Sequence, residues 1–390
     1  MGLGLCHSAA AVGLHVTLVG RDEASGRRGL DRLGVDLQKR VSRGRMGAAE
    51  REALLTAVSA APDDSALAGC GLVIEAVAED RDIKATVLRR IEAVAPPEAI
   101  IATNTSGLPV TGLAAALARP GRFIGLHFFS PVDRMALVEV VVGRDTAAAT
   151  TEAALAWVRC LGKQPIVVRD SPGFFTSRVF TAYLDEAMVM LAEGMAPERI
   201  EAAATAAGLA VGPLAMLDET GIVLNWQQAR QAKADGLDDR VCRALAWPVL
   251  DRMVSSLGRR GRREGSGFYD YPEAGPKRLW AGLANVYPPL AAQPALEAVE
   301  RRLMHAQALE AARCLEEGVV ASVADANTGS VLGLGFPAAA GGVLGQVERR
   351  GLTAFVAECD ALADAHGERF RPSPWLRERA SKGTGFTSQA

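Results

Sequence analysis

The chain has 390 residues, of which 49% are apolar and 23% are charged, and its formal net charge is −2. This length predicts two or three domains, and the balanced charge argues against a nucleic-acid binder or a membrane-surface protein. The apolar runs are too short for a membrane span, and the N-terminus lacks a signal-peptide pattern. Six scattered cysteines without a Cys-x-x-Cys pair argue against disulfides and a metal site, and they fit a reducing, cytoplasmic location.

The first 170 residues alternate short β-branched runs with helical patterns. The runs lie at 15–19, 72–77, 99–104, 122–129, 136–142 and 165–170. Strands that alternate with helices predict an α/β fold with a largely parallel, doubly wound sheet. The opening Gly-Leu-Gly is typical of a helix N-terminus that holds a pyrophosphate, because unpaired N–H groups and the helix dipole meet there. This signal is weak without support, since Gly-x-Gly begins many helices.

The strand predicted at 15–19 is followed by Gly20-Arg21. An NAD-binding domain usually presents an acidic residue to the ribose at this position. Glycine followed by arginine is closer to the pattern that accepts the extra phosphate of NADP. The alternative is that Asp22 or water serves the ribose and that Arg21 is a solvated surface charge.

Two polar segments follow later strands. EAVAEDRDIK (75–84) brings Glu75 and Glu79 to the carboxyl end of a strand, where open α/β sheets bind ligands. Lys84 opens the next helix, where a cation is unfavourable, so a ligand role competes with an ordinary exposed helix. TNTSGLP (103–109) supplies hydroxyl and amide groups that either cap the next helix or contact a ligand.

His127 lies near the end of an apolar run, and Glu139 lies twelve residues later in another. Most histidines in apolar strands are hydrogen-bonded core residues. Adjacent strands could, however, bring the imidazole and the carboxylate together, and a carboxylate raises the basicity of histidine as a general base requires. Burying an unpaired glutamate costs free energy, so the presence of each residue supports a paired role for the other.

Helical patterns dominate after Ser171, and residues 178–195 align with 302–319 at an offset of 124. This repeat predicts two related helical domains, although alanine- and glutamate-rich helices also resemble each other by chance. We therefore expect three domains, at 1–170, 171–275 and 276–390. The arginine run at 259–263 either meets phosphates of coenzyme A or forms a solvated loop, which is the commoner case.

Four segments in this order, EAVAEDRDIK, TNTSGLP, LHFFSPVDRMALVEVV and DSPGFFTSRVF, resemble the L-3-hydroxyacyl-CoA dehydrogenases of fatty-acid β-oxidation. GSGFYDYPEAGPKRLW and SVADANTGSVLGLGFPAAAGGVL are similar to the α subunits of bacterial fatty acid oxidation complexes. Those subunits carry an enoyl-CoA hydratase domain before the dehydrogenase. The resemblance implies a Rossmann-like NAD-binding domain followed by two tandem all-α domains.

The resemblance also implies oxidation of (S)-3-hydroxyacyl-CoA to 3-ketoacyl-CoA, with NAD favoured over NADP. His127 would take the hydroxyl proton, and Glu139 would orient the imidazole of His127. Ser106 and Ser177 would contact the substrate. The implied cofactor-binding residues are Met1, Gly2, Gly20, Val77, Glu79, Lys84, Ser106 and Ser130. An acyl-CoA substrate, a thiolase subunit and a homo-oligomer are the partners it implies.

Three positions depart from the usual family pattern. Gly20 replaces the ribose-binding aspartate, while Ser130 and Ser177 each replace an asparagine. Serine reaches less far than asparagine, which affects cofactor choice and efficiency more than reaction type.

Met1-Gly2 matches the last two positions of the family's Gly-x-Gly-x-Met-Gly fingerprint. We therefore expect the first strand of the sheet to be missing, with poor NAD binding and a loosened N-terminal half. An inactive fragment or an acyl-CoA-binding assembly subunit is the alternative function. A further alternative, an NADP-linked β-hydroxyacid dehydrogenase, would need a catalytic lysine in place of His127.

Overall fold

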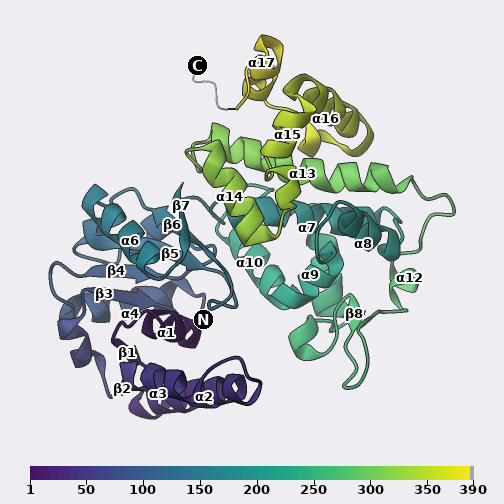
Figure 1. Ribbon diagram of the computed structural model, residues 1–390. Coiled ribbons are helices and arrows are strands. Elements are labelled where there is room, and N and C mark those ends of the chain that lie inside the picture. Colours follow the sequence, from purple (N-terminus) through teal and green to yellow (C-terminus); the bar gives the residue numbers. More distant parts are fainter. Residues whose placement is uncertain (387–390) are drawn as a thin grey trace. The chain divides into compact units, whose positions relative to one another are not determined.

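The computed structural model describes residues 1–386, and the chain divides into two units between Phe174 and Phe175 (Figure 1). The first unit mixes strands and helices, and the second is almost entirely helical, as the sequence predicts. No helix in the described residues is long and apolar enough to cross a bilayer.

The strands of the first unit form two separate sheets (Figure 1). One sheet is the parallel pair β1–β2, and the other has five strands in the order β3-β4-β5-β6-β7. Within the larger sheet only β5 and β6 are antiparallel to each other. The strands are β1 (Val16–Val19), β2 (Val58–Ala61), β3 (Leu72–Glu75), β4 (Ile100–Thr103), β5 (Phe123–Phe128), β6 (Leu137–Val142) and β7 (Gln164–Arg169).

Helices cover these strands, and polar caps fix where several of them begin. Asp22 accepts a hydrogen bond from the backbone of Ser25 at the start of α2, and Asp80 caps α4 in the same way. The first helix, α1, has no side-chain cap. The α-helices are α1 (Gly2–Ala10), α2 (Glu23–Ser42), α3 (Ala48–Ala57), α4 (Arg81–Val94), α5 (Val110–Ala114) and α6 (Ala148–Cys160). Short 3-10 turns span Asp64–Gly69 and Pro120–Arg122.

The core of the larger sheet holds β5 and β6 together. Ile124 and Leu126 of β5 and Val138 and Val140 of β6 are fully buried in one cluster, which α6 covers with side chains that include Val158. Each such side chain contributes about 1.5–3 kcal/mol through burial. The core therefore fixes the register of the two strands that carry His127 and Glu139.

Among the described residues, the second unit is built from helices with one small hairpin, β8–β9. Its main helices are α7 (Thr176–Ala192), α8 (Pro197–Ala206), α9 (Pro213–Thr220), α10 (Ile222–Ala234), α11 (Trp247–Asp251), α13 (Leu296–Glu316), α14 (Val323–Leu334), α16 (Leu352–His366) and α17 (Pro374–Lys382). Shorter elements are β8 (Tyr269–Asp270), β9 (Arg278–Leu279), α12 (Leu283–Val286) and α15 (Gly345–Arg350), with a π-helical turn at Arg252–Ser256 and 3-10 turns at Arg262–Glu264, Ala338–Ala340 and Glu368–Phe370.

Two sets of ion pairs join α7 to α13, the helices that align in the sequence repeat. Arg178 of α7 binds Glu310 and Glu317 at 2.6 Å each. Arg302 of α13 binds Glu186 and, at 2.6 Å, Glu193. The two sets are equivalent under the offset of 124 residues: the position equivalent to Arg178 is Arg302, and those equivalent to Glu310 and Glu317 are Glu186 and Glu193. Each helix thus supplies the arginine of one set and the glutamates of the other. A domain boundary at 275/276 stays a prediction.

The arginine run at 259–263 is partly engaged within the second unit. Arg259 donates to the carbonyl oxygen of Gly267 at 2.5 Å and stacks on Trp280. Arg262 pairs with Glu219 at 2.5 Å. These two guanidinium groups therefore have structural partners, which favours the loop interpretation over a phosphate site for them.

Replacing Arg302 by methionine is expected to loosen the contact between α7 and α13. Glu186 is buried and also binds Arg369 at 2.6 Å, so the variant removes one of its two cationic partners and should cost about 1.5–3 kcal/mol, the contribution of hydrogen bonds to a charged group. Hydrogen exchange of the α7 and α13 amides measures the change in local opening. The control is Lys382→Met, which removes an exposed pair with Glu378. Equal exchange in the two variants would refute a stabilising role for the crossed pairs.

The thiol of Cys6 is expected to resist alkylation at neutral pH. Burial in α1 raises the pKa of Cys6 to about 11, so little thiolate exists until the pH approaches that value. At pH 8 iodoacetamide should modify Cys6 roughly 10²-fold more slowly than an ordinary thiol. Cys160 is exposed in the same unit and serves as the reference in a mass-spectrometric time course. Comparable rates for both cysteines at pH 8 would contradict the burial of Cys6.

Candidate active site

His127 and Glu139 face each other across the antiparallel strands β5 and β6. The register pairs the two residues directly, and Nδ1 of His127 lies 2.7 Å from Oε2 of Glu139. Glu139 has no exposed surface, and His127 is also buried. The contact occupies Nδ1 and leaves Nε2 as the ring nitrogen that can exchange a proton with a ligand.

Aromatic side chains restrict the imidazole of His127. The ring of Phe129 lies 4.6 Å from it, and that of Phe174 lies 5.9 Å away, measured between ring centroids. Phe174 adopts a positive φ of 50°, which is strained for a bulky residue and tends to occur near functional sites. The surroundings therefore limit water and hold one ring orientation.

Glu79 organises the turn after β4. Its carboxylate accepts hydrogen bonds from the hydroxyl of Thr105 at 2.5 Å and from the backbone of Ser106 at 3.0 Å. The backbone N–H of Gly107 also points to it, at 3.3 Å. Glu79 thus joins the segment after β3 to the turn that carries Ser106.

Lys84 is buried, although its position at a helix start suggested a ligand contact. Its ammonium group lies 2.9 Å and 3.1 Å from the two carboxylate oxygens of Glu75 and 3.3 Å from Glu79. The hydroxyl of Thr103 donates to Glu75 at 2.7 Å. Lys84 therefore neutralises two carboxylates, one of them fully buried, and this need explains a lysine at this position.

Asn104 connects the Ser106 turn to the histidine strand. Its side-chain oxygen accepts a hydrogen bond from the backbone of Phe128 at 3.0 Å. Asn104 was not singled out in the sequence, although it lies within TNTSGLP. The signal was available in principle, because an amide directly after a strand can bridge to the neighbouring strand.

The N-terminus of α1 is open. Gly2 is the first residue of the helix, and nothing lies within 4 Å of the position that a Cβ atom would take there. The first turn also has no side-chain cap. Free N–H groups and open space are what a phosphate at a helix N-terminus requires.

The end of β1 leaves no room for a side chain at Gly20. A Cβ atom at Gly20 would lie 2.4 Å from Oγ of Ser25. The carboxylate of Asp22 accepts from the Ser25 backbone at 2.6 Å, and this bond lowers the pKa of Asp22. Asp22 therefore stays ionised as a helix cap, and Arg21 beside it is exposed.

The remaining candidate residues occupy different parts of the chain. Met1 is exposed beside the start of α1, and Val77 donates its backbone N–H to Glu75 at 2.6 Å. Ser130 is exposed and follows the aromatic segment after β5. Ser177 lies in the first turn of α7, in the second unit.

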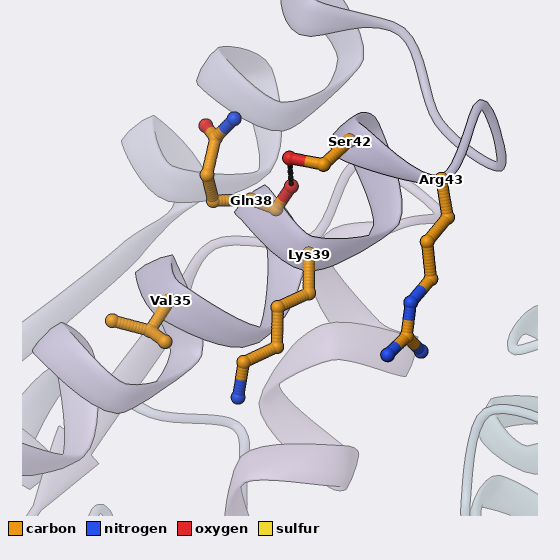
Figure 2. A pocket seen from close by; sticks show the side chains of 5 residues that line it. All are labelled: Val35, Gln38, Lys39, Ser42 and Arg43. Carbon is orange, nitrogen blue, oxygen red and sulfur yellow. Dashed lines mark hydrogen bonds between the residues drawn. The ribbon is translucent and has the colours of Figure 1, made fainter.

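A shallow hollow of 270 Å³ lies on the outer face of α2, and it contains none of these residues. Figure 2 shows the side chains that line it, which project from this helix and from the residue that caps its C-terminus: Val35, Gln38, Lys39, Ser42 and Arg43. The hydroxyl of Ser42 donates to the backbone of Gln38 at 3.0 Å, so it is already used. With no converging groups from a second element, the hollow lacks the features of an active site.

Comparison with known families and proteins covers both units. Residues 1–171 match "3-hydroxyacyl-CoA dehydrogenase, NAD binding domain", and residues 173–271 match "3-hydroxyacyl-CoA dehydrogenase, C-terminal domain". The fatty acid oxidation complex subunit alpha of Shewanella amazonensis is 36% identical over 90% of this chain. The chain spans about half the length of the curated relatives it matches, 49% in this case.

Two solved structures are also similar to this chain. A 3-hydroxybutyryl-CoA dehydrogenase from Escherichia coli has a TM-score of 0.84 at 27% identity, covering 98% of this chain and 96% of its own. The (S)-3-hydroxybutyryl-CoA dehydrogenase from Ralstonia eutropha is 32% identical with a TM-score of 0.65, covering 70% of this chain and 96% of its own. This chain belongs to the 3-hydroxyacyl-CoA dehydrogenase family of oxidoreductases, with an NAD-binding domain at residues 1–171.

Proposed function

We propose that this chain oxidises the 3-hydroxyl group of an (S)-3-hydroxyacyl-CoA to a ketone in fatty-acid β-oxidation. The buried contact between His127 and Glu139 is the observation that carries the proposal. A paired, water-shielded imidazole with one free nitrogen is suited to remove a hydroxyl proton. Membership of the dehydrogenase family supports this reaction class over an NADP-linked enzyme with a catalytic lysine.

The residues around α1 fit the cofactor. When bound, NAD supplies the acceptor for the hydride that leaves C3 of the substrate. The open N-terminus of α1, with Met1 and Gly2, would hold the pyrophosphate, and Gly20 would border the ribose. The nicotinamide side would be lined by Val77, Glu79, Ser106 and Ser130. Lys84 would act indirectly, by holding the carboxylate of Glu79.

His127 and its neighbours would perform the proton chemistry. Nε2 of His127 removes the proton from the hydroxyl oxygen while Nδ1–H donates to Glu139. The Glu139 carboxylate holds this tautomer and stabilises the imidazolium ion that forms, which a buried site does more strongly than water. Ser106 would orient the reacting oxygen, and Ser177 would contact the substrate from α7.

The proposed partners of this chain are taken from the names of its relatives. The Shewanella protein is named as a subunit of a fatty acid oxidation complex, so we propose that this chain also works beside other enzymes of that process in the cytoplasm. A thiolase subunit and a second copy of this chain are the proposed partners. The alternative, an acyl-CoA-binding assembly subunit without turnover, makes a different prediction in the assay below.

Removal of the imidazole tests the proposed base. We expect His127→Ala to lower kcat with (S)-3-hydroxybutyryl-CoA and NAD by ~10²-fold or more, the usual contribution of a general base. Glu139→Gln should lower kcat with little change in KM, because Glu139 acts through His127. His305→Ala is a control at a histidine of the second unit. The assay measures NADH formation.

Two outcomes would count against this proposal. Near-normal turnover of His127→Ala would remove His127 from the mechanism. A parent chain that binds both the acyl-CoA and NAD but forms no NADH would favour the assembly-subunit alternative.

Cofactor choice is expected to favour NAD only modestly. Gly20 carries no carboxylate that would repel the 2′-phosphate of NADP, and the exposed cation of Arg21 lies beside it. Arg21→Ala should therefore reduce kcat/KM with NADP by up to ~5-fold, the range of an exposed ion pair, with a smaller effect on NAD. Arg27→Ala is the matched control, since Arg27 already pairs with Glu23. A higher kcat/KM with NADP than with NAD in the parent chain would show that the NAD assignment is wrong.

A further inference from the structure

Asn104 lies where the pairing between β4 and β5 ends. The last register partners of these two parallel strands are Thr103 and Gly125, although β5 continues to Phe128. Beyond that point β4 no longer supplies backbone groups to its neighbour. The backbone N–H of Phe128 instead donates to Oδ1 of Asn104 at 3.0 Å. The side chain of Asn104 therefore takes the place of a strand partner for the last residue of β5.

The donor at Phe128 also fixes which way the amide of Asn104 is turned. A backbone N–H can only donate, so the amide atom that meets it must be the oxygen. An aspartate at this position would offer an oxygen in the same place. Leucine has a similar size but cannot accept a hydrogen bond. The role of this one acceptor can therefore be separated from the space that the side chain fills.

The backbone around Asn104 is anchored to β3 and to the segment that follows it. The N–H of Asn104 donates to the carbonyl oxygen of Glu75 at 2.9 Å. The hydroxyl groups on either side are held as well, Thr103 by the carboxylate of Glu75 at 2.7 Å and Thr105 by that of Glu79 at 2.5 Å. Asn104 thus stands on a fixed segment, and its amide can transmit that position to β5.

The hydrogen bond from Phe128 acts on the peptide group next to His127. This peptide joins His127 to Phe128, so its position sets where the imidazole stands opposite Glu139, 2.7 Å away. On its other side, Asn104 begins the turn that carries Ser106. One amide therefore connects the strand that bears the imidazole to the turn that bears the serine hydroxyl.

We propose that Asn104 is a positioning residue for proton transfer, which fixes the imidazole of His127 relative to the Ser106 turn through the backbone N–H of Phe128. This inference rests on the proposed dehydrogenase reaction, in which the base and the serine hydroxyl must meet the same substrate oxygen. Small displacements of a reacting group slow the chemical step strongly. Asn104 itself touches no reacting atom in this role, so its loss should lower kcat and leave KM unchanged.

Two substitutions of Asn104 separate the acceptor from the shape of the side chain. Asn104→Leu removes the acceptor and should lower kcat roughly tenfold or more, with little change in KM for NAD or (S)-3-hydroxybutyryl-CoA. Asn104→Asp keeps an oxygen for the Phe128 N–H and should retain kcat within about threefold. Asn104→Ala also lacks an acceptor, and it replaces the leucine variant if leucine prevents folding.

A buried threonine at the other end of β5 provides the matched control. The hydroxyl of Thr150 donates to the carbonyl oxygen of Gly121 at 2.8 Å, just before β5 begins. Thr150→Val removes one buried bond between a side chain and the backbone, as Asn104→Leu does, but far along the strand from His127. Its kcat should stay within about twofold of the parent value, because the imidazole keeps its place.

Nuclear magnetic resonance measures the position of the imidazole without turnover. In the full chain without NAD or substrate, the Nδ1 proton of His127 reports the hydrogen bond to Glu139, and His127→Ala assigns its signal. Asn104→Leu should shift or broaden this signal, whereas Asn104→Asp and the threonine control should preserve it. The ring proton of His305, in the second unit, is the internal reference.

Three results would overturn the proposal. An unchanged kcat together with an unshifted His127 signal in Asn104→Leu would show that the imidazole does not depend on this amide. An equal loss of kcat in Thr150→Val would assign the effect to general stability. A loss of kcat in Asn104→Asp as large as in the leucine variant would show that the acceptor is not the feature that matters. If the parent chain forms no NADH, the proposed function fails, while the His127 signal still decides the role of Asn104.

Discussion

The buried carboxylate of Glu139 is the constraint on which the proposed site depends. An ionised carboxylate without exposed surface must have a partner, and β5 supplies it as His127 at the directly opposite position. A slip of one residue between β5 and β6 would turn the two side chains to opposite faces of the sheet. The apolar residues that alternate with them, such as Leu126 and Val140, fix the register through their own burial. The same core that stabilises the sheet thus positions the imidazole.

The sequence predicted this pair because ionisable residues are rare in apolar strands, and each needed an explanation. It did not predict the role of Lys84, whose environment depends on how β3 and α4 pack. Glu75 was recognised at the end of its strand, but the contact between its carboxylate and the Lys84 ammonium is a tertiary feature. Strand β2 was missed for a related reason. Two of its four residues are alanine, which has a low strand propensity, and pairing with β1 overrides that preference.

In the second unit the repeat was visible in the sequence, but its physical consequence was not. Alanine and glutamate positions aligned at an offset of 124, which chance could also produce between two helices of similar composition. The ion pairs add a stronger argument, because Arg178 and Arg302 exchange equivalent glutamate partners across the α7–α13 contact. A reciprocal exchange of this kind is what a two-fold axis between identical surfaces generates. A duplication whose halves pack against each other would account for both the alignment and the crossed contacts, and it stays a prediction.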